Sequence, residues 1–358
     1  MKVLTLVSPW SPQPSLKEML RDEELGRSPR QSLYQHALGS VNVDRSYFQQ
    51  LPAWKRRLYR LLPQEIARAI EGYLQRTKYD AVVTWSESLT IGFALLLKIT
   101  RRKFPHVALV YSISRTKKAW SLRAVASHVD RFVMWTSHQR EFALNRLHIP
   151  PAKIVWTGYL VDHLYYKPMS VQTDTISSAE REMRDYRTLV RALEGLRIPC
   201  HIAARETPGK NDRWVQDIRE LSPLPSDISI GPLKDLNELR LLYARSKFVV
   251  LPLLENDADS GTTVILEAMA MGKAVICTRT SGQRDNILEG ETGMYVPVGD
   301  AEALRKAILY LWENPGVAES MGKRGRDVIE QHHTLDGFVE VVRTTVDEVL
   351  REYREGRT

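Results

Sequence analysis

The feature that most constrains the fold is a regular alternation, in the C-terminal half, of short apolar runs with amphipathic segments. The apolar runs have strand length, and the segments between them place apolar residues at helical spacing. This alternation is typical of βαβ units, which build a parallel, doubly wound sheet. The predicted strands are 175–179, 200–204, 228–230, 248–251, 274–277 and 294–296, and the predicted helices are 185–196, 236–245, 262–271 and 301–313.

The N-terminal half repeats this pattern less regularly, and a chain of 358 residues is long enough for two domains of ordinary size. We therefore expect an α/β fold of two Rossmann-like, doubly wound domains that face each other across a cleft. The first domain is predicted to span 1–167 and the second 168–334, with an amphipathic helix in 335–358 that packs on one of them. The predicted strands of the N-terminal half are 3–7, 81–84, 107–111, 132–135 and 154–157.

Candidate chemistry is concentrated between Leu251 and Cys277, a stretch that reads as strand, polar loop, helix, glycine and strand. Asp259-Ser260 is predicted to cap the helix, and the free N–H groups of Gly261, Thr262 and Thr263 favour an anion such as a diphosphate. The Glu267 carboxylate could accept two hydrogen bonds from a ribose diol, and Asp259 could hold a hydroxyl of a transferred sugar. The alternative is an ordinary helix with a capping aspartate and a solvated glutamate.

The same stretch resembles the donor-site signature of glycosyltransferase family 4, whose members are retaining enzymes of the GT-B fold. That signature runs Glu, seven residues, Glu, Ala-Met-Ala, Gly and an apolar strand. Here Glu267 is the second acid, Asp259 occupies the first acidic position, and Ser260-Gly261-Thr262 replaces the usual Gly-Phe-Gly. The resemblance continues through 280–287 and 290–296, and it is strongest over about 175–300.

The resemblance implies transfer of a sugar from a nucleoside diphosphate donor, with a UDP-sugar favoured, to a lipid or glycan acceptor. It further implies retention of anomeric configuration and no need for a metal or another cofactor. Asp259 and Glu267 would be the catalytic pair. Arg181 and Arg184 align with the family's arginine and lysine and would bind the diphosphate, although Glu180 replaces the expected glycine. Read alone, these two arginines are surface charges among acids. Ile230 lies where family members hold the nucleobase.

The N-terminal half resembles the family more faintly. The glycine-rich loop after the first strand is replaced by Ser8-Pro9-Trp10-Ser11-Pro12. The histidine often found after the third or fourth strand is missing. Ser112, Ser114 and Arg115 stand in its place, and we predict them on the acceptor side.

The net charge of +8 hides a strongly basic N-terminal part. Residues 54–62 combine four cations with Trp54 and Tyr59, so this piece could lie on an anionic membrane surface or form a solvated helix face. The next helix should turn Ile66, Ile70, Tyr73 and Leu74 towards the core. Nucleic acid is not an expected partner, because no stacking pattern or motif supports it.

Other features exclude several classes. The longest apolar stretch, Leu89–Leu97, is far shorter than the ~20 residues of a membrane-spanning helix. The nine histidines are scattered, so we expect no metal site. Cys200 and Cys277 each lie in an apolar strand, which indicates a reduced, cytoplasmic protein, peripheral at the membrane if the basic segment binds lipid.

Two rival functions stay open. One is an isomerase of the same fold, such as a nucleotide-sugar epimerase, which binds a nucleotide but needs no acceptor. The other is a non-catalytic relative that acts as a partner subunit. Two departures from the family pattern, Asp259 and the missing histidine, leave this second interpretation open.

Overall fold

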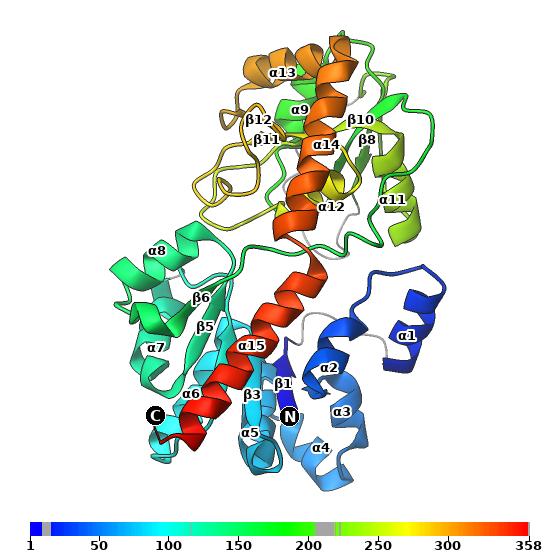
Figure 1. Ribbon diagram of the computed structural model, residues 1–358. Coiled ribbons are helices and arrows are strands. Elements are labelled where there is room, and N and C mark those ends of the chain that lie inside the picture. Colours follow the sequence, from blue (N-terminus) through cyan, green and yellow to red (C-terminus); the bar gives the residue numbers. More distant parts are fainter. Residues whose placement is uncertain (9–15, 115, 205–217, 219, 222, 357–358) are drawn as a thin grey trace. The chain divides into compact units, whose positions relative to one another are not determined.

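The computed structural model describes residues 1–8, 16–114, 116–204, 218, 220, 221 and 223–356. The chain divides into two compact units (Figure 1). Unit 1 comprises residues 1–25, 30–158 and 336–358, and unit 2 comprises 26–29 and 159–335. Each unit contains one parallel sheet of six strands with helices packed on it, as the alternating pattern predicts.

Unit 1 has the strand order β2-β1-β3-β4-β5-β6. Its strands are β1 (Val3–Val7), β2 (Ser40–Val43), β3 (Ala81–Trp85), β4 (His106–Leu109), β5 (Arg131–Met134) and β6 (Ile154–Trp156). Its helices are α1 (Leu16–Glu24), α2 (Ser32–Leu38), α3 (Arg45–Gln50), α4 (Ala53–Tyr59), α5 (Gln64–Gln75), α6 (Glu87–Ile99), α7 (Thr116–Val125), α8 (Ser137–Asn145) and α15 (Leu335–Arg354).

Helix α5 packs on the sheet of unit 1 mainly through its small residues, so the predicted core face is wrong for Ile66 and Leu74, whereas Tyr73 is partly buried against the core. Ala67, Ala69 and Gly72 are buried, whereas Ile66 and Leu74 are 49% and 53% exposed. The approach is close: a Cβ on Gly72 would lie 2.6 Å from the Leu6 side chain. A bulky residue at position 72 would hold α5 away from β1. The larger side chains of Ile66 and Leu74 therefore lie on the exposed side of the helix.

Helix α15 also belongs to unit 1. Phe338 on α15 contacts Trp85 and Trp135, with ring centroids 6.1 and 6.2 Å apart. Further along, Val342, Val346 and Val349 are fully buried.

Unit 2 has the strand order β12-β11-β10-β7-β8-β9. Its strands are β7 (Thr175–Ala179), β8 (Cys200–Ala203), β9 (Ile228–Gly231), β10 (Ser246–Leu251), β11 (Ala274–Thr278) and β12 (Gly293–Val296). Its helices are α9 (Tyr186–Leu193), α11 (Leu236–Arg245), α12 (Thr262–Ala270), α13 (Ala301–Glu313) and α14 (Pro315–His332).

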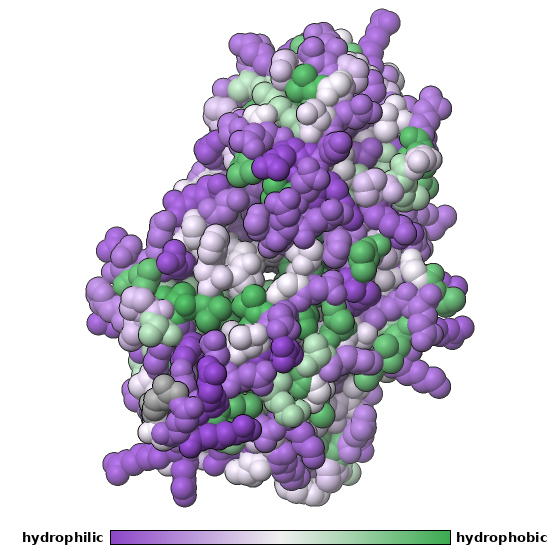
Figure 2. Space-filling model, in the orientation of Figure 1, coloured by the Kyte–Doolittle hydropathy of each residue, from purple (hydrophilic) through white to green (hydrophobic). Residues whose placement is uncertain are grey.

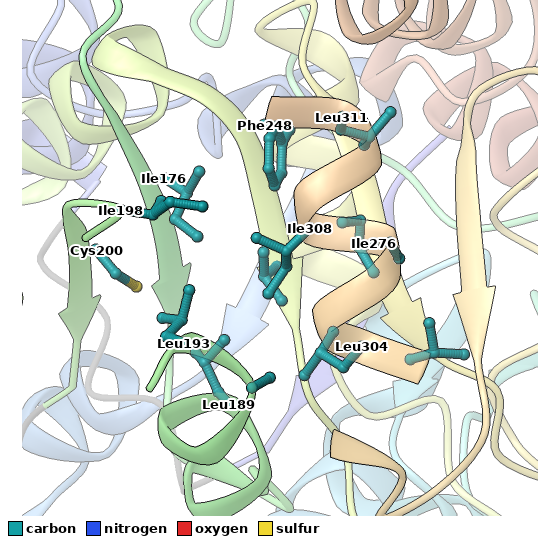
Figure 3. Packing of buried hydrophobic residues seen from close by; sticks show 14 of the residues in the cluster. Ile176, Leu189, Leu193, Ile198, Cys200, Phe248, Ile276, Leu304, Ile308 and Leu311 are labelled. Carbon is teal, nitrogen blue, oxygen red and sulfur yellow. The ribbon is translucent and has the colours of Figure 1, made fainter. Parts of the chain in front are cut away.

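One half of the unit 2 core lies between the sheet and the helices α9 and α13. Figure 3 shows Leu304, Ile308 and Leu311 of α13 directed towards the strands that carry Phe248 and Ile276. Each fully buried side chain of this kind contributes about 1.5–3 kcal/mol. The other half of the core packs α12 and α14 against β10 and β11, and it includes Val161, Tyr165 and Tyr166.

The boundary between the units falls at Gly158–Tyr159. The sequence had placed it near Tyr166–Pro168. The difference has a physical reason, because Val161, Tyr165 and Tyr166 are at most 5% exposed in the core of unit 2 and therefore belong to that unit. Among the described residues, none of the helices combines the length and apolar character that crossing a membrane requires.

Candidate functional site

The sheet of unit 2 reverses its direction of growth between β7 and β10. From β7 the chain builds outwards through β8 and β9, and then returns to add β10, β11 and β12 on the other side. The carboxyl ends of the two strands at such a reversal are where open α/β sheets bind ligands. Two of the predicted site segments follow these strands: residues 180–184 come after β7, and 259–267 come after β10.

The loops after β7 and β10 are joined by backbone hydrogen bonds. The N–H of Asp185 donates to the carbonyl of Pro252 at 3.1 Å, and the N–H of Leu254 donates to that of Met183 at 2.9 Å. In the β7 loop, Glu180 and Met183 have φ angles of 71° and 57°. Such left-handed conformations cost energy in residues other than glycine, and they cluster at functional sites. The resemblance leads one to expect glycine at position 180, and glycine adopts such a left-handed backbone easily. This chain has the same left-handed backbone with a glutamate.

The two predicted phosphate-binding arginines have different environments. Arg181 is exposed. Arg184 is only 3% exposed, and it donates from Nε to the carbonyl of Ala179 at 2.9 Å and from Nη1 to that of Glu182 at 2.7 Å. Two of its three guanidinium nitrogens therefore donate to backbone carbonyls, which limits the contact that Arg184 can make with a phosphate. A phosphate role for either arginine stays a prediction.

Helix α12 begins at the reversal point, but its cap differs from the one predicted. The N-cap is Gly261, with φ 86°, and no described side chain caps the helix. Asp259 and Ser260 precede it instead, and the carbonyl of Asp259 accepts from the N–H of Thr262 at 3.2 Å and from its hydroxyl at 2.9 Å. The N–H of Thr262 is thus used within the protein. Exposed Thr263 follows in the first turn, where the helix dipole favours an anion.

A hydrogen-bonded network that the sequence did not predict supports the start of α12. Fully buried Gln283 donates from Nε2 to the carbonyl of Ser260 at 3.1 Å and to the hydroxyl of Thr262 at 3.0 Å. Asn286 donates to the same hydroxyl at 3.1 Å. The loop carrying them packs closely, because a Cβ on Gly282 would lie 2.0 Å from the carbonyl oxygen of Ala258. In the sequence, only the resemblance of segment 280–287 to the family pointed to Gln283 and Asn286.

Glu267 lies on α12 and is 8% exposed, so it is not the solvated glutamate of the alternative interpretation. Two tyrosines cover it: the Tyr243 hydroxyl donates to Oε2 at 3.0 Å, and Tyr166 supplies a second side-chain hydrogen bond. The pKa of Glu267 is raised to about 7, because burial and the charge of Glu180 raise it by more than the two tyrosine hydrogen bonds lower it. This carboxyl therefore titrates near neutral pH.

Ile230 lies in β9, at the edge of the unit 2 sheet, and is partly buried against the core. A cavity of about 620 Å³ is lined mostly by residues that precede β7, β8 and β10, and its described lining includes none of the predicted site residues. That end of the sheet is opposite to the start of α12, and we attach no role to the cavity. Among the described residues, no group of three or more histidine, cysteine or acidic side chains is arranged to hold a metal ion.

In unit 1, Ser112 and Ser114 follow β4 at the carboxyl edge of its sheet, while Arg115 lies outside the described residues. The loop is held from two sides. Buried Glu87 accepts from the N–H groups of Tyr111 and Ser112, both at 2.7 Å. Gln139 accepts from the N–H of Ile113 at 2.7 Å. Neither Glu87 nor Gln139 was predicted from the sequence.

Part of the chain is similar to known proteins. Residues 180–314 match the family model described as glycosyl transferases group 1. A curated relative, N-acetyl-alpha-D-glucosaminyl L-malate synthase of Bacillus anthracis, is 31% identical over 30% of this chain and 28% of its own length. A GDP-mannose-dependent phosphatidylinositol monomannoside mannosyltransferase of Mycolicibacterium smegmatis is 33% identical over 28% of this chain and 25% of its own. This chain thus matches only about a quarter of each relative.

Solved structures are similar over the whole chain. Sucrose-phosphate synthase of Thermosynechococcus elongatus superposes with a TM-score of 0.74, at 15% identity and 99% coverage of both chains. HepE of Anabaena, solved with UDP and glucose, gives a TM-score of 0.70 at 15% identity, covering 98% of this chain and 99% of its own. Identities this low show the fold alone. The chain therefore has the predicted GT-B fold, and its segment 180–314, which carries the candidate site, is similar to group 1 glycosyltransferases.

Proposed function

We propose that this protein is a glycosyltransferase that moves a sugar from a nucleoside diphosphate donor to an acceptor. The observation that carries the proposal is the convergence, at the reversal point of the unit 2 sheet, of the β7 loop, the start of α12 and buried Glu267. All of these lie within the segment that resembles group 1 glycosyltransferases.

The proposed roles follow from the chemistry of each group. The start of α12 and the charge of Arg181 and Arg184 stabilise the diphosphate as it leaves, because negative charge builds on it in the transition state. Glu267 accepts hydrogen bonds from the ribose. Asp259 orients the donor sugar, and Ile230 borders the nucleobase. UDP-sugars are favoured, with retention of configuration and without a metal. Such chemistry fits a cytoplasmic enzyme.

A thermal shift experiment with UDP, GDP, ADP and their sugars tests the donor site. Stabilisation by one nucleotide family, lost in Glu267→Ala and kept in Glu313→Ala, supports the proposal; Glu313 is an exposed glutamate at the end of α13. If millimolar nucleotide gives no shift in the wild type, the non-catalytic alternative gains support. Conversion of the nucleotide-sugar without any acceptor would favour the epimerase.

A membrane-borne acceptor is the second part of the proposal. Trp54, Leu58 and Leu61 recur at helical spacing on and after α4, and they are 66%, 51% and 80% exposed. Tyr59 is buried instead. The exposed cations Arg56, Arg57 and Arg60 lie among them. Figure 2 shows, on the face drawn, apolar residues reaching a largely hydrophilic surface. An apolar stripe among cations suits the interface of an anionic membrane.

Sedimentation with lipid vesicles tests this surface. We expect the protein to bind vesicles with anionic lipid and to remain free with zwitterionic vesicles. Trp54→Ala with Leu58→Ala should weaken binding about tenfold or more, because each buried apolar side chain contributes about 1.5–3 kcal/mol. Trp156→Ala, which removes a tryptophan 55% exposed on β6, is the matched control. Equal binding by both variants would contradict the membrane role.

A further inference from the structure

Glu267 is enclosed by tyrosines from two other segments of unit 2. Tyr243 comes from α11 and is fully buried, and Tyr166 precedes β7 and is 2% exposed. The Tyr243 hydroxyl lies 3.0 Å from Oε2 of Glu267, and Tyr166 also hydrogen-bonds the carboxylate. The pKa values of both tyrosines are raised, mainly by burial, so their hydroxyls remain protonated donors at neutral pH.

The position of Tyr166 is fixed by an arginine on α14. Arg326 donates from Nη1 to the carbonyl of Tyr166 at 2.8 Å, to that of His163 at 2.9 Å and to that of Ala270 at 2.7 Å. Ala270 ends α12, the helix that carries Glu267. The guanidinium of Arg326 therefore ties the backbone of Tyr166 to the end of α12. This contact fixes the position of Tyr166 relative to Glu267.

Counting lone pairs shows what this arrangement can still bind. An ionised carboxylate has about four acceptor positions. The two tyrosine hydroxyls occupy two of them, which leaves two for a ligand. A vicinal diol presents two adjacent hydroxyl donors and would complete the set. An arginine partner would instead fill both oxygens with a forked contact and neutralise the charge. The two tyrosines hold the carboxylate in place, but they leave acceptor positions open and do not neutralise its charge.

Among the described residues, Tyr166, Tyr243 and Glu180 shift the pKa of Glu267, and Glu267 in turn raises the pKa of Tyr165. Burial and the nearby carboxylate of Glu180 disfavour the ionised form of Glu267, and the two tyrosine hydrogen bonds favour it. Removing either hydroxyl should raise the pKa of Glu267 further above its usual value. At neutral pH, a larger fraction of the carboxyl would then be protonated, and it would be a poorer acceptor.

We propose that Tyr243 and Tyr166 are positioning residues that hold Glu267 ionised and oriented, so that its two remaining acceptor positions bind the 2′- and 3′-hydroxyls of the donor ribose. This inference rests on the proposed function. It assigns the recognition of ribonucleotides over 2′-deoxynucleotides to a carboxylate held by two tyrosines.

Calorimetric titration tests the proposal. The probes are the nucleoside diphosphate that gives the largest thermal shift and its 2′-deoxy analogue, each titrated between pH 6 and 8.5. Tyr243→Phe and Tyr166→Phe should weaken binding of the ribonucleotide about five- to tenfold at pH 7, on the basis that a pKa rise of one unit lowers the ionised fraction by up to tenfold. Binding should recover towards the wild-type value at pH 8.5. Ionisation of the phosphate is common to all variants and cancels in the comparison.

Two controls separate positioning from folding. Tyr59→Phe removes the same type of contact in unit 1, where the Tyr59 hydroxyl lies 2.7 Å from Oε2 of Glu71, and it should leave nucleotide affinity unchanged. Glu267→Gln cannot titrate, so its affinity should be lower than that of the wild type and equal for the two nucleotides. In turnover assays, the tyrosine variants should raise the KM for the donor more than they lower kcat.

The outcomes are distinguishable. If the wild type binds no nucleotide, the proposed function itself fails. If the wild type binds and Glu267→Ala does not, but the tyrosine variants follow the wild-type pH profile, the positioning role is overturned while the donor site stands. A loss of affinity that is equal at every pH also overturns it, because such a loss reports only damaged packing.

Discussion

Arg184 and Leu253 form an isolated antiparallel bridge between the loop after β7 and the loop after β10. These two loops belong to strands that lie side by side in the sheet but about 70 residues apart in the sequence. The Arg184 side chain also donates to the carbonyls of Ala179 and Glu182. Together with the bridge, these hydrogen bonds fix the β7 loop at its start and in its middle. The charge of Arg184 therefore acts from a set position between the loops that follow β7 and β10.

The left-handed backbone at Glu180 predicts that glycine is better tolerated there. Glu180→Gly should raise the free energy of unfolding by about 0.5–1 kcal/mol, since relief of a strain of about 1–2 kcal/mol is partly offset by the flexibility of unfolded glycine. Chemical denaturation measures this change. Glu180→Gln removes the charge but keeps the side chain, so it should not stabilise the backbone. Equal stabilisation by both would show that charge, rather than φ, is responsible.

The raised pKa of Glu267 predicts a specific dependence of stability on pH. The unfolded side chain loses its proton near its ordinary pKa of 4.5, whereas the folded one keeps it up to about pH 7. The native state therefore holds more protons between these values, and its stability falls as the pH rises through this window. Glu267→Gln lacks this loss. Its Tm relative to that of the wild type should rise by several degrees between pH 4.5 and 7 and then stay level.

Scanning calorimetry without nucleotide at half-unit pH steps would follow this change. Glu313→Gln controls for the substitution itself. A constant Tm difference across the range would mean that Glu267 titrates in the folded protein as it does in the unfolded chain.

Gly261 is predicted to be irreplaceable at the start of α12. Its φ is 86°, and a Cβ there would lie 2.5 Å from Cδ2 of Leu251. Gly261→Ala combines an unfavourable conformation with overpacking, so it should cost about 2–4 kcal/mol and abolish the thermal shift with nucleotide. Gly290 has a φ of 75° and open space around its Cα, so Gly290→Ala isolates the conformational part. Equal losses in both variants would argue that the Leu251 contact has no effect.

Glu87 is predicted to control the acceptor-side loop without affecting the donor site. Glu87→Ala removes the acceptor for the N–H groups of Tyr111 and Ser112, which should cost unit 1 about 2–3 kcal/mol, as for hydrogen bonds to a charged group. Acceptor-dependent turnover should fall at least tenfold while nucleotide affinity stays the same. Glu87→Gln, which retains a carbonyl oxygen, should restore most of the activity. A parallel loss of nucleotide affinity would contradict this division of labour.

Much of the fold follows from sequence periodicity, and the misses have physical causes. Several strands of unit 2 were predictable because they are short apolar runs, as in Ala274–Thr278, which is buried throughout. Strand β2, with the sequence Ser-Val-Asn-Val, is too short and polar to stand out. The exposure of Ile66 and Leu74 on α5 was not predictable, because close packing through Gly72 leaves no apolar pattern in the sequence.

The candidate site was only partly predictable for a related reason. Asp259 and Glu267 lie within one recognisable stretch, and the structure places them at the predicted loop and helix. Tyr243 and Tyr166, by contrast, reach Glu267 from 24 residues and about 100 residues away. Such contacts depend on which elements the sheet order brings together. They cannot be predicted from the spacing of residues along the sequence.

The position of α15 in unit 1 has a consequence for the order in which the protein can be completed. Unit 1 contains residues from both sides of unit 2 in the sequence, so Phe338, which packs against Trp85 and Trp135, is translated only after residues 159–335. Residues 159–335 of unit 2 form an uninterrupted segment and can assemble earlier. Unit 2 can therefore fold in a nascent chain while unit 1 still lacks the helix that covers its two tryptophans. Premature termination after residue 335 should give a protein that recruits chaperones through unit 1.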